Sequence, residues 1–181
     1  MMSTIAQSNA QQSAQPMCGD IDIKIAKDGT WFHEGGPIGR KELVCLFASI
    51  LKRDEYGEYW LQTPVEKARI VVDDAPFIAV ELFACECGCD QKLSLRTNVD
   101  EVVPIGLDNP IRVEHDSKTG EPAPYVTLRQ GEGMFPIEAK INRAVFYELV
   151  NRGVEETIDG EVYFGIWSNN EFFPLGQLDE D

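Results

Sequence analysis

Two short segments carry the side chains best suited to bind an anion. Residues 63–67 read Thr-Pro-Val-Glu-Lys and supply a hydroxyl, a carboxylate and an ammonium group. Residues 96–98 read Arg-Thr-Asn and supply a guanidinium, a hydroxyl and an amide. A guanidinium binds an oxyanion through its planar fork, and an ammonium acts as a point charge. If the fold brings both segments to one surface, they form a site for a phosphate or a carboxylate, with Arg129 and Arg143 as weaker candidates. The predicted ligand-binding residues are Thr63, Glu66, Lys67, Arg96, Thr97, Asn98 and Arg129.

The same charged side chains also have a purely structural interpretation. Glu66, Lys67 and Arg96 can form ion pairs between parts of the fold and close the ends of strands. Structural ion pairs bring charged groups together and shift their pKa values, as binding sites also do. Ligand binding and structural ion pairing are therefore both open for these residues.

Three alternate cysteines, Cys85, Cys87 and Cys89, form a second candidate centre. Alternate residues of a strand share a face, and three converging thiolates with one further ligand suit zinc. Structural zinc sites usually pair cysteines two to four residues apart, with a second pair elsewhere. We therefore expect reduced thiols with no metal and no other cofactor, and keep metal or redox chemistry as the alternative. The residues that could supply a fourth ligand are Cys18, Cys45, His33 and His115.

Enzyme chemistry has little support in the sequence. Residues 34–41 contain several glycines and precede an expected helix, as a P-loop does. They do not match a P-loop, because Glu42 occupies the position of the magnesium-binding hydroxyl. No nucleophile–base spacing is recognisable, and the two histidines are expected to be surface or packing residues. Catalysis on a nucleotide through Glu66 or Asp74 is the weakest functional hypothesis, since the pair Asp73 and Asp74 is most simply part of a turn.

The composition narrows the classes of partner. The 181-residue chain has a formal net charge of −15, which opposes binding to duplex nucleic acid and to an anionic membrane surface. No apolar run approaches the ~20 residues that span a bilayer. The first residues lack the basic and apolar regions of a signal peptide, and the five cysteines are an odd number. We therefore expect a cytoplasmic protein with reduced thiols that binds neither nucleic acid nor membrane.

Periodic patterns predict the elements that must position these residues. Ile21, Ile23 and Ile25 alternate with polar residues as in a half-buried strand, whereas residues 40–53 place their apolar side chains on one helical face. The class is α+β, with two antiparallel sheets that each pack one helix. The expected helices are residues 40–53 and 138–151. The expected strands are residues 21–25, 30–33, 58–63, 67–72, 77–84, 92–97, 111–115, 124–129, 162–167 and 171–175, with a loop at 98–110.

The two halves of the chain resemble each other at a constant offset of 99 residues. We interpret this as an internal ββαββ duplication that produces two lobes with a fixed interface. Ligand sites favour such boundaries, so the boundary is where we expect function. The matched pairs are Pro37 with Pro136, Ile38 with Ile137, Lys41 with Lys140, Phe47 with Phe146, and Arg53 with Arg152.

An ordered set of short motifs over about residues 18–176 resembles the bacterial family called Domain of Unknown Function 1285. The resemblance implies a two-domain α+β fold with internal duplication and a C-terminal domain superficially like a pleckstrin-homology barrel. It also implies a nucleotide-like ligand at the domain interface and a role in signalling, without an established activity. The motifs are Gly29-Thr30-Trp31, Pro37-Ile38-Gly39-Arg40, Leu46-Phe47, Thr63-Pro64-Val65-Glu66-Lys67, Asp74-Ala75-Pro76-Phe77, Arg96-Thr97-Asn98, Pro124-Tyr125-Val126, Arg129, Arg143 and Phe146-Tyr147-Glu148-Leu149.

These observations predict a disordered tail at residues 1–17, an N-terminal lobe at 18–76 and a C-terminal lobe at 77–177. The leading functional hypothesis is a ligand-binding protein that holds a small anionic molecule between the lobes. A protein-interaction module without a small-molecule ligand is the second hypothesis, and an enzyme is the third.

Overall fold

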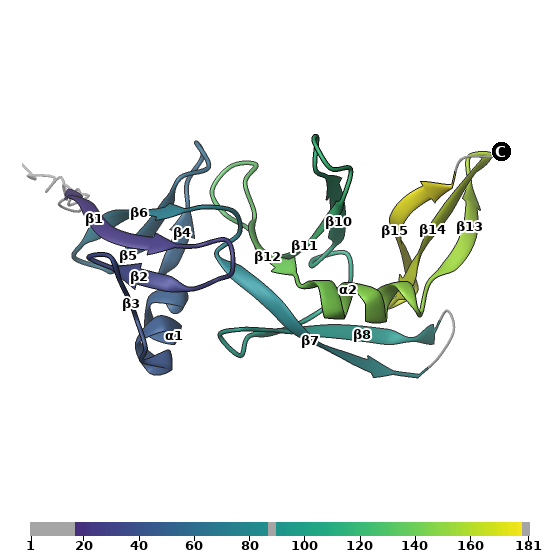
Figure 1. Ribbon diagram of the computed structural model, residues 1–181, viewed down its shortest axis with the longest axis horizontal. Coiled ribbons are helices and arrows are strands. Elements are labelled where there is room, and N and C mark those ends of the chain that lie inside the picture. Colours follow the sequence, from purple (N-terminus) through teal and green to yellow (C-terminus); the bar gives the residue numbers. More distant parts are fainter. Residues whose placement is uncertain (1–16, 87–89, 179–181) are drawn as a thin grey trace, which may run out of the picture.

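The computed structural model describes residues 17–86 and 90–178 (Figure 1). Apart from Met17, the tail predicted at 1–17 lies outside these ranges, and so do Cys87 and Cys89 of the cysteine motif. Within these ranges the chain is mostly β-structure with two helices, arranged in two six-stranded sheets and one three-stranded sheet. No helix among the described residues is long and apolar enough to cross a membrane.

The first sheet, with its helix, is called the N-terminal domain below. Its strand order is β3-β2-β1-β6-β5-β4, in which β1 and β6 are parallel and all other neighbours are antiparallel. Ile23 and Ile25 are buried and Lys24 between them is exposed, which confirms the predicted alternation for these residues, whereas Ile21 is exposed. The elements are β1 (Met17–Ile25), β2 (Trp31–His33), β3 (Gly36–Pro37), α1 (Lys41–Ser49), β4 (Leu51–Arg53), β5 (Tyr59–Gln62) and β6 (Lys67–Val72).

The second and third sheets, with their helix, are called the C-terminal domain. The second sheet has the order β10-β11-β12-β7-β8-β9 with one parallel pair, β12 and β7, and the third has the order β13-β14-β15. Residues 73–76, called the connector, join β6 to β7. The elements are β7 (Phe77–Cys85), β8 (Lys92–Thr97), β9 (Val102–Pro104), β10 (Ile111–His115), β11 (Pro122–Arg129), β12 (Ile137–Ile141), α2 (Arg143–Val150), β13 (Val154–Ile158), β14 (Glu161–Ser168) and β15 (Glu171–Leu178).

Both predicted helices are shorter than the sequence suggested. The first ends at Ser49, and Leu51 begins β4 with a fully buried side chain. The second begins only after Asn142, whose side chain accepts a hydrogen bond from the Val145 N–H at 2.8 Å. An asparagine in this capping position starts a helix, so residues 137–141 before it are free to form the strand β12. The loop predicted at 98–110 also contains a strand, β9.

The predicted offset of 99 residues does not survive in the structure. The helices begin at Lys41 and Arg143, which are 102 positions apart, and Lys41 is helical whereas its predicted counterpart Lys140 lies in a strand. The prediction of purely antiparallel sheets is also wrong, because each six-stranded sheet contains one parallel pair. Alternation along a strand shows which face is buried but carries no information about the direction of its neighbour.

The two halves nevertheless share an order of elements. In each, an antiparallel hairpin precedes a helix, and three antiparallel strands follow it. They differ in pairing, since β6 joins β1 in one continuous sheet while β13–β15 form a sheet of their own.

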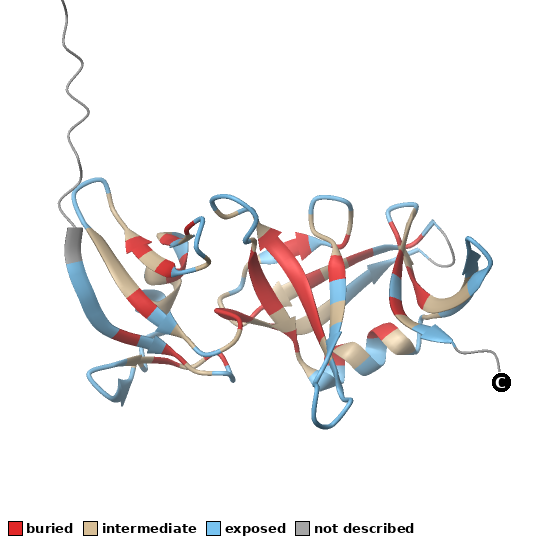
Figure 2. Ribbon diagram, turned by 90° about the horizontal axis from the view of Figure 1, so that it is seen from above, coloured by how far each residue is buried: buried red, intermediate tan, exposed pale blue. Residues whose placement is uncertain are grey.

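Apolar side chains of both domains contribute to the core. Trp31 and Phe77 are almost completely buried, and the Trp31 ring stacks on Phe47 of α1 with centroids 6.2 Å apart. Figure 2 shows buried positions on strands of all three sheets, and exposed positions at the loops and also along strands and helices. Burying a side chain of this size contributes about 1.5–3 kcal/mol, so the core holds each sheet firmly enough to position its polar residues.

Candidate functional site

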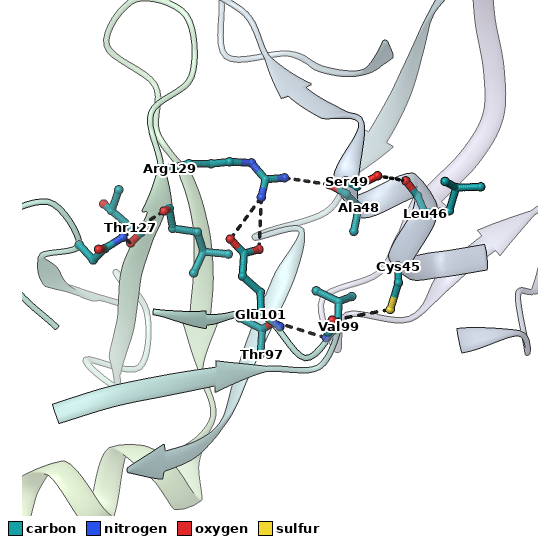
Figure 3. A network of polar contacts seen from close by, with 11 residues as sticks. Cys45, Leu46, Ala48, Ser49, Thr97, Val99, Glu101, Thr127 and Arg129 are labelled. Carbon is teal, nitrogen blue, oxygen red and sulfur yellow. Dashed lines mark hydrogen bonds and ion pairs between the residues drawn. The ribbon is translucent and has the colours of Figure 1, made fainter. Parts of the chain in front are cut away.

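Arg129, at the end of β11, bridges the two domains (Figure 3). Its Nη2 donates to the carbonyl oxygen of Ala48 in α1 at 2.8 Å, and its Nη1 lies 3.2 Å from Glu101. Its guanidinium also lies over the Phe77 ring, 5.7 Å from the centroid. Arg129 is therefore at the boundary, as the ligand hypothesis requires, but its donors serve the protein itself.

Arg96 forms a second charged cluster beside the boundary. Its Nε donates to Glu81 at 2.7 Å and its Nη1 donates to Asp100 at 2.7 Å. Asp100 also pairs with Lys41 of α1 at 2.6 Å, so the cluster crosses from one domain to the other. Hydrogen bonds from Lys41 and then Arg96 hold the pKa of Asp100 below its ordinary value. Arg96 itself pairs only within the C-terminal domain, and the ion pair that crosses between the domains is the one from Lys41 to Asp100.

Thr97 and Asn98 shape the turn after β8. The fully buried Thr97 hydroxyl accepts hydrogen bonds from the N–H groups of Val99 and Glu101 at 3.4 and 3.2 Å. The Asn98 amide donates to the carbonyl oxygen of Gly29 in the N-terminal domain at 3.4 Å. Gly29 is buried with φ +81°, and a Cβ there would lie 2.7 Å from Ile78. Only a glycine permits this close approach of the two domains.

The remaining predicted residues lie elsewhere. Thr63 and Glu66 form the turn between β5 and β6, where the Thr63 hydroxyl accepts from the Glu66 N–H at 3.0 Å. Lys67 places its ammonium over the Trp60 ring, 4.4 Å from the centroid. Lys67 begins β6, whereas the connector follows Val72 at its other end. Six strand residues span roughly 20 Å, so Lys67 and the turn before it lie at the end of β6 that is far from the connector.

A further contact at the boundary involves Arg53, which the sequence assigned to a helix. The Arg53 carbonyl accepts from the Glu132 N–H at 2.8 Å, and its Nη1 donates to the Pro136 carbonyl at 2.7 Å. Its guanidinium lies 4.8 Å from the Tyr59 centroid and 5.2 Å from the Phe135 centroid. The loop between β11 and β12 of the C-terminal domain thus hydrogen-bonds to the edge strand β4.

A cleft of about 630 Å³ lies between the β1–β2 turn and the C-terminal domain. The N-terminal domain contributes Lys27 and Asp28, and the C-terminal domain contributes the β10–β11 hairpin, the end of β12 and the start of α2. The sequence pattern identified Lys27 and Asp28 only as a hairpin turn, and it could not show what faces that turn. The described lining residues are Lys27, Asp28, Ile78, Asp116, Thr119, Glu121, Pro122, Ala123, Pro124, Lys140, Ile141, Asn142, Arg143, Phe146 and Tyr147.

The cleft is less acidic than the rest of the molecule. Its described lining has three cations and three carboxylates, whereas the whole chain has 16 cations and 31 acidic residues. Asp28 and Asp116 are engaged by backbone N–H groups of their own turns, which lower the pKa of both. Arg143, a weaker candidate from sequence, lies 3.5 Å from Glu121. Among the residues that the structure describes, Lys27 has no ion-pair partner.

Apolar side chains complete the walls of the cleft. Ile78, Pro122 and Phe146 line it together with the exposed ring of Tyr147. Ligand sites of small molecules typically enclose roughly 300–1,000 Å³ and combine apolar walls with a few polar groups. The cleft has the size and surface that a metabolite the size of a nucleotide needs.

The adjacent carboxylates Asp73 and Asp74, which the sequence assigned to a turn, are both paired. Asp73 pairs with Lys24 at 3.0 Å, and Asp74 accepts from the Tyr125 hydroxyl at 2.8 Å and from Lys140 at 2.6 Å. Burial, followed by the hydrogen bond to Asp74, raises the pKa of Tyr125.

The structure describes the side chains of both histidines and of two cysteines, Cys45 and Cys85. His33 and His115 end β2 and β10 and are exposed. Cys85 is exposed, and the Cys45 thiol lies 3.6 Å from the Val99 carbonyl. The described ranges contain no group of three or more His, Cys, Asp or Glu side chains that could hold a metal ion, and the complete cysteine motif lies partly outside them.

Two family models together match almost the whole chain. Residues 11–75 match the N-terminal domain of DUF1285, described as a domain of unknown function, and residues 76–175 match the DUF1285 C-terminal domain. No protein of curated function matches the chain.

Two solved structures are similar to this one. A DUF1285 family protein from Silicibacter pomeroyi DSS-3 is 48% identical with a TM-score of 0.81, over 91% of this chain and 85% of that one. Another, from Shewanella baltica OS155, is 26% identical with a TM-score of 0.54, over 73% of this chain and 92% of that one. Because the family models cover both domains, the chain belongs to the DUF1285 family.

Proposed function

We propose that this protein is a cytoplasmic ligand-binding protein that holds a small anionic, nucleotide-like molecule in the cleft between its domains. Its role is to signal the presence of that molecule and not to transform it. The observation that carries the proposal is the cleft itself, which both domains line and which has as many cations as carboxylates in a strongly acidic chain.

The charges favour an anion with an apolar part. Lys27 approaches from the N-terminal domain, while Lys140 and Arg143 approach from the C-terminal domain. An anionic group between them would contact both domains at once, and Phe146 and Tyr147 would contact a ring or another apolar part of the ligand. A ligand that contacts both domains stabilises the relative position of the domains in which both contacts are made. Binding would therefore change how the domains are positioned, and this change would be the signal.

The first test is native mass spectrometry of the freshly purified protein, with its denatured mass as the reference. An excess of a few hundred daltons that disappears on denaturation identifies a bound metabolite. The second test is a titration with adenosine monophosphate, followed by amide chemical shifts. We expect saturable shifts at Lys27, Asn142 and Arg143.

A matched pair of variants locates the site. Arg143→Gln removes a cleft cation and should weaken adenosine monophosphate binding by at least about threefold, the size of one exposed charge interaction. Lys92→Gln removes an exposed cation at the start of β8 and should leave the affinity unchanged. Equal affinities in both variants, or no saturable binding to the wild type, would contradict the proposal.

A specific surface supports a second candidate function, a protein-interaction module. Gly57 packs against the Phe135 ring and Gly133 packs against Glu55, so the β4–β5 turn and the β11–β12 loop lie against each other. Their most exposed apolar side chains are Tyr56, 79% exposed, and Met134, 92% exposed. The exposed carboxylates around this two-domain tip are Glu55, Glu58 and Glu132.

The tip suits a partner segment with apolar and cationic side chains. Replacing Met134→Ser should abolish capture of such a partner, whereas Leu107→Ser, at a 74% exposed leucine in another loop, should not. Capture that is insensitive to both substitutions would reject the tip as the contact surface. The family resemblance also implies a C-terminal domain that is similar to a pleckstrin-homology domain. This expectation is part of the second proposal, because such domains present grooves and sheet edges to peptides.

A further inference from the structure

Adjacent residues of the connector are held by different domains. The Asp73 N–H donates to the Ile25 carbonyl at 3.0 Å, and the Asp73 carboxylate pairs with Lys24, so Asp73 belongs to the N-terminal domain. The carboxylate of Asp74 instead accepts from Tyr125 and Lys140 of the C-terminal domain. The transition between the two domains therefore falls at the bond between Asp73 and Asp74.

Lys140 belongs both to this connector contact and to the cleft. It is cross-strand neighbour of Tyr125 on β11 and of Ile78 on β7, so the three side chains share one face of the second sheet. Its ammonium lies 2.6 Å from Asp74, its side chain is 33% exposed, and it lines the cleft together with Ile78. Of the three cleft cations, Lys140 is the one whose ion-pair partner is a connector residue.

The other groups near Asp74 keep their own partners. Arg112 stacks over Tyr125 with 4.5 Å to the ring centroid and forms a bidentate pair with the buried Glu138 at 2.6 and 2.8 Å. Arg112 cannot replace Lys140 at Asp74 without leaving the Glu138 charge unpaired, which is costly at a buried position. When Lys140 turns away, Asp74 therefore keeps only the Tyr125 hydroxyl of its two C-terminal partners.

We propose that an anion in the cleft competes with Asp74 for Lys140, so that ligand binding releases the connector from the C-terminal domain. This inference rests on the proposed function. One ammonium carries three N–H donors but a single charge, and two anions that share it each bind it less strongly. The coupling is reciprocal, because the factor by which the bound ligand weakens the Asp74–Lys140 pair equals the factor by which that pair weakens ligand binding.

The neighbouring carboxylate provides a matched control. Asp74→Asn and Asp73→Asn each remove one negative charge from adjacent positions, and therefore change the net charge of the protein equally. Asp74→Asn frees Lys140 while an amide oxygen can still accept from Tyr125, whereas Asp73→Asn leaves Lys140 paired. Titrated with adenosine monophosphate, Asp74→Asn should bind about fivefold more tightly than Asp73→Asn, the lower end of typical coupling.

A second measurement needs no substitution. Hydrogen exchange of residues 73–77 in the wild type should become faster when adenosine monophosphate is added, although ligands usually slow exchange near their sites. Unchanged or slower exchange there overturns the inference, and so does equal affinity of the two variants, while either result leaves the proposed function intact. If the wild-type protein does not bind adenosine monophosphate in the cleft, the proposed function fails and the inference falls with it.

Discussion

Arg129 and Ala48 are 81 residues apart in the chain, yet the Arg129 guanidinium donates to the Ala48 carbonyl oxygen at 2.8 Å. The carbonyl belongs to the last turn of α1, where backbone oxygens lack partners within the helix. Arg129 thus caps a helix of the other domain and neutralises Glu101 at the same time. A residue whose type suggests an anion site serves here to join two domains.

Replacing Arg129→Gln should therefore destabilise the protein more than it affects any ligand. The variant loses a charge-assisted hydrogen bond and leaves Glu101 without its cation, which costs about 1–3 kcal/mol in the free energy of unfolding. Urea denaturation measures this difference. Arg152→Gln, at an exposed arginine after α2, is the control and should remain within about 0.5 kcal/mol of the wild type. Equal stability of the two variants would show that the bridge contributes nothing.

Gly131→Ala tests the contact in which the C-terminal domain adds to the edge of β4. A Cβ at Gly131 would lie 2.9 Å from the Arg53 carbonyl oxygen and would also collide with the Phe135 carbonyl. Both are backbone atoms that cannot turn aside, so we expect a loss of about 1–3 kcal/mol in unfolding free energy. Thermal denaturation should show Gly39→Ala, where a Cβ meets open space, to be nearly neutral. A fully stable Gly131→Ala protein would argue against this close approach.

Tyr59 makes the stability sensitive to alkaline pH. Burial raises its pKa from the ordinary value of 10.0 to about 12. Because the folded-state pKa is the higher one, the neutral phenol contributes stability that is complete below about pH 10 and is lost as the pH rises towards 12. Tyr59→Phe should flatten the decline of the unfolding free energy in this range, whereas Tyr147→Phe, at an exposed tyrosine, should not. Identical pH profiles for Tyr59→Phe and the wild type would contradict the assignment.

Lys67→Gln should leave adenosine monophosphate binding unchanged, although the sequence placed Lys67 among the ligand residues. Its ammonium lies over Trp60 at the end of β6 away from the connector. The same titration in Lys27→Gln should show weaker binding, because Lys27 lines the cleft. A loss of affinity in Lys67→Gln with none in Lys27→Gln would move the site to the β5–β6 turn.

The sequence determined the local structure wherever one physical signal dominated. Alternation of Ile21, Ile23 and Ile25 predicted a strand of β1, and period-two patterns predicted the β7–β8 hairpin that the structure confirms. The errors arose where the same apolar residues are compatible with both a helix and a strand. Leu51 and Ile141 fit an apolar helical face as well as a strand, and burial against a sheet placed both in strands.

What the sequence established by itself was the family and a fold of two domains with two helices and many strands, whereas the boundary between the domains as the functional site stays a prediction. Only the tertiary structure decided which charged residues meet there. Arg96 and Arg129 reach the boundary and are paired with carboxylates, Lys67 lies at the far end of its strand, and Lys27, from an unremarkable hairpin turn, faces Lys140 and Arg143 across a cleft. The physical reason is that residue type fixes what a side chain can bind, whereas the pairing order and direction of strands, which the local pattern does not encode, fix what it lies beside.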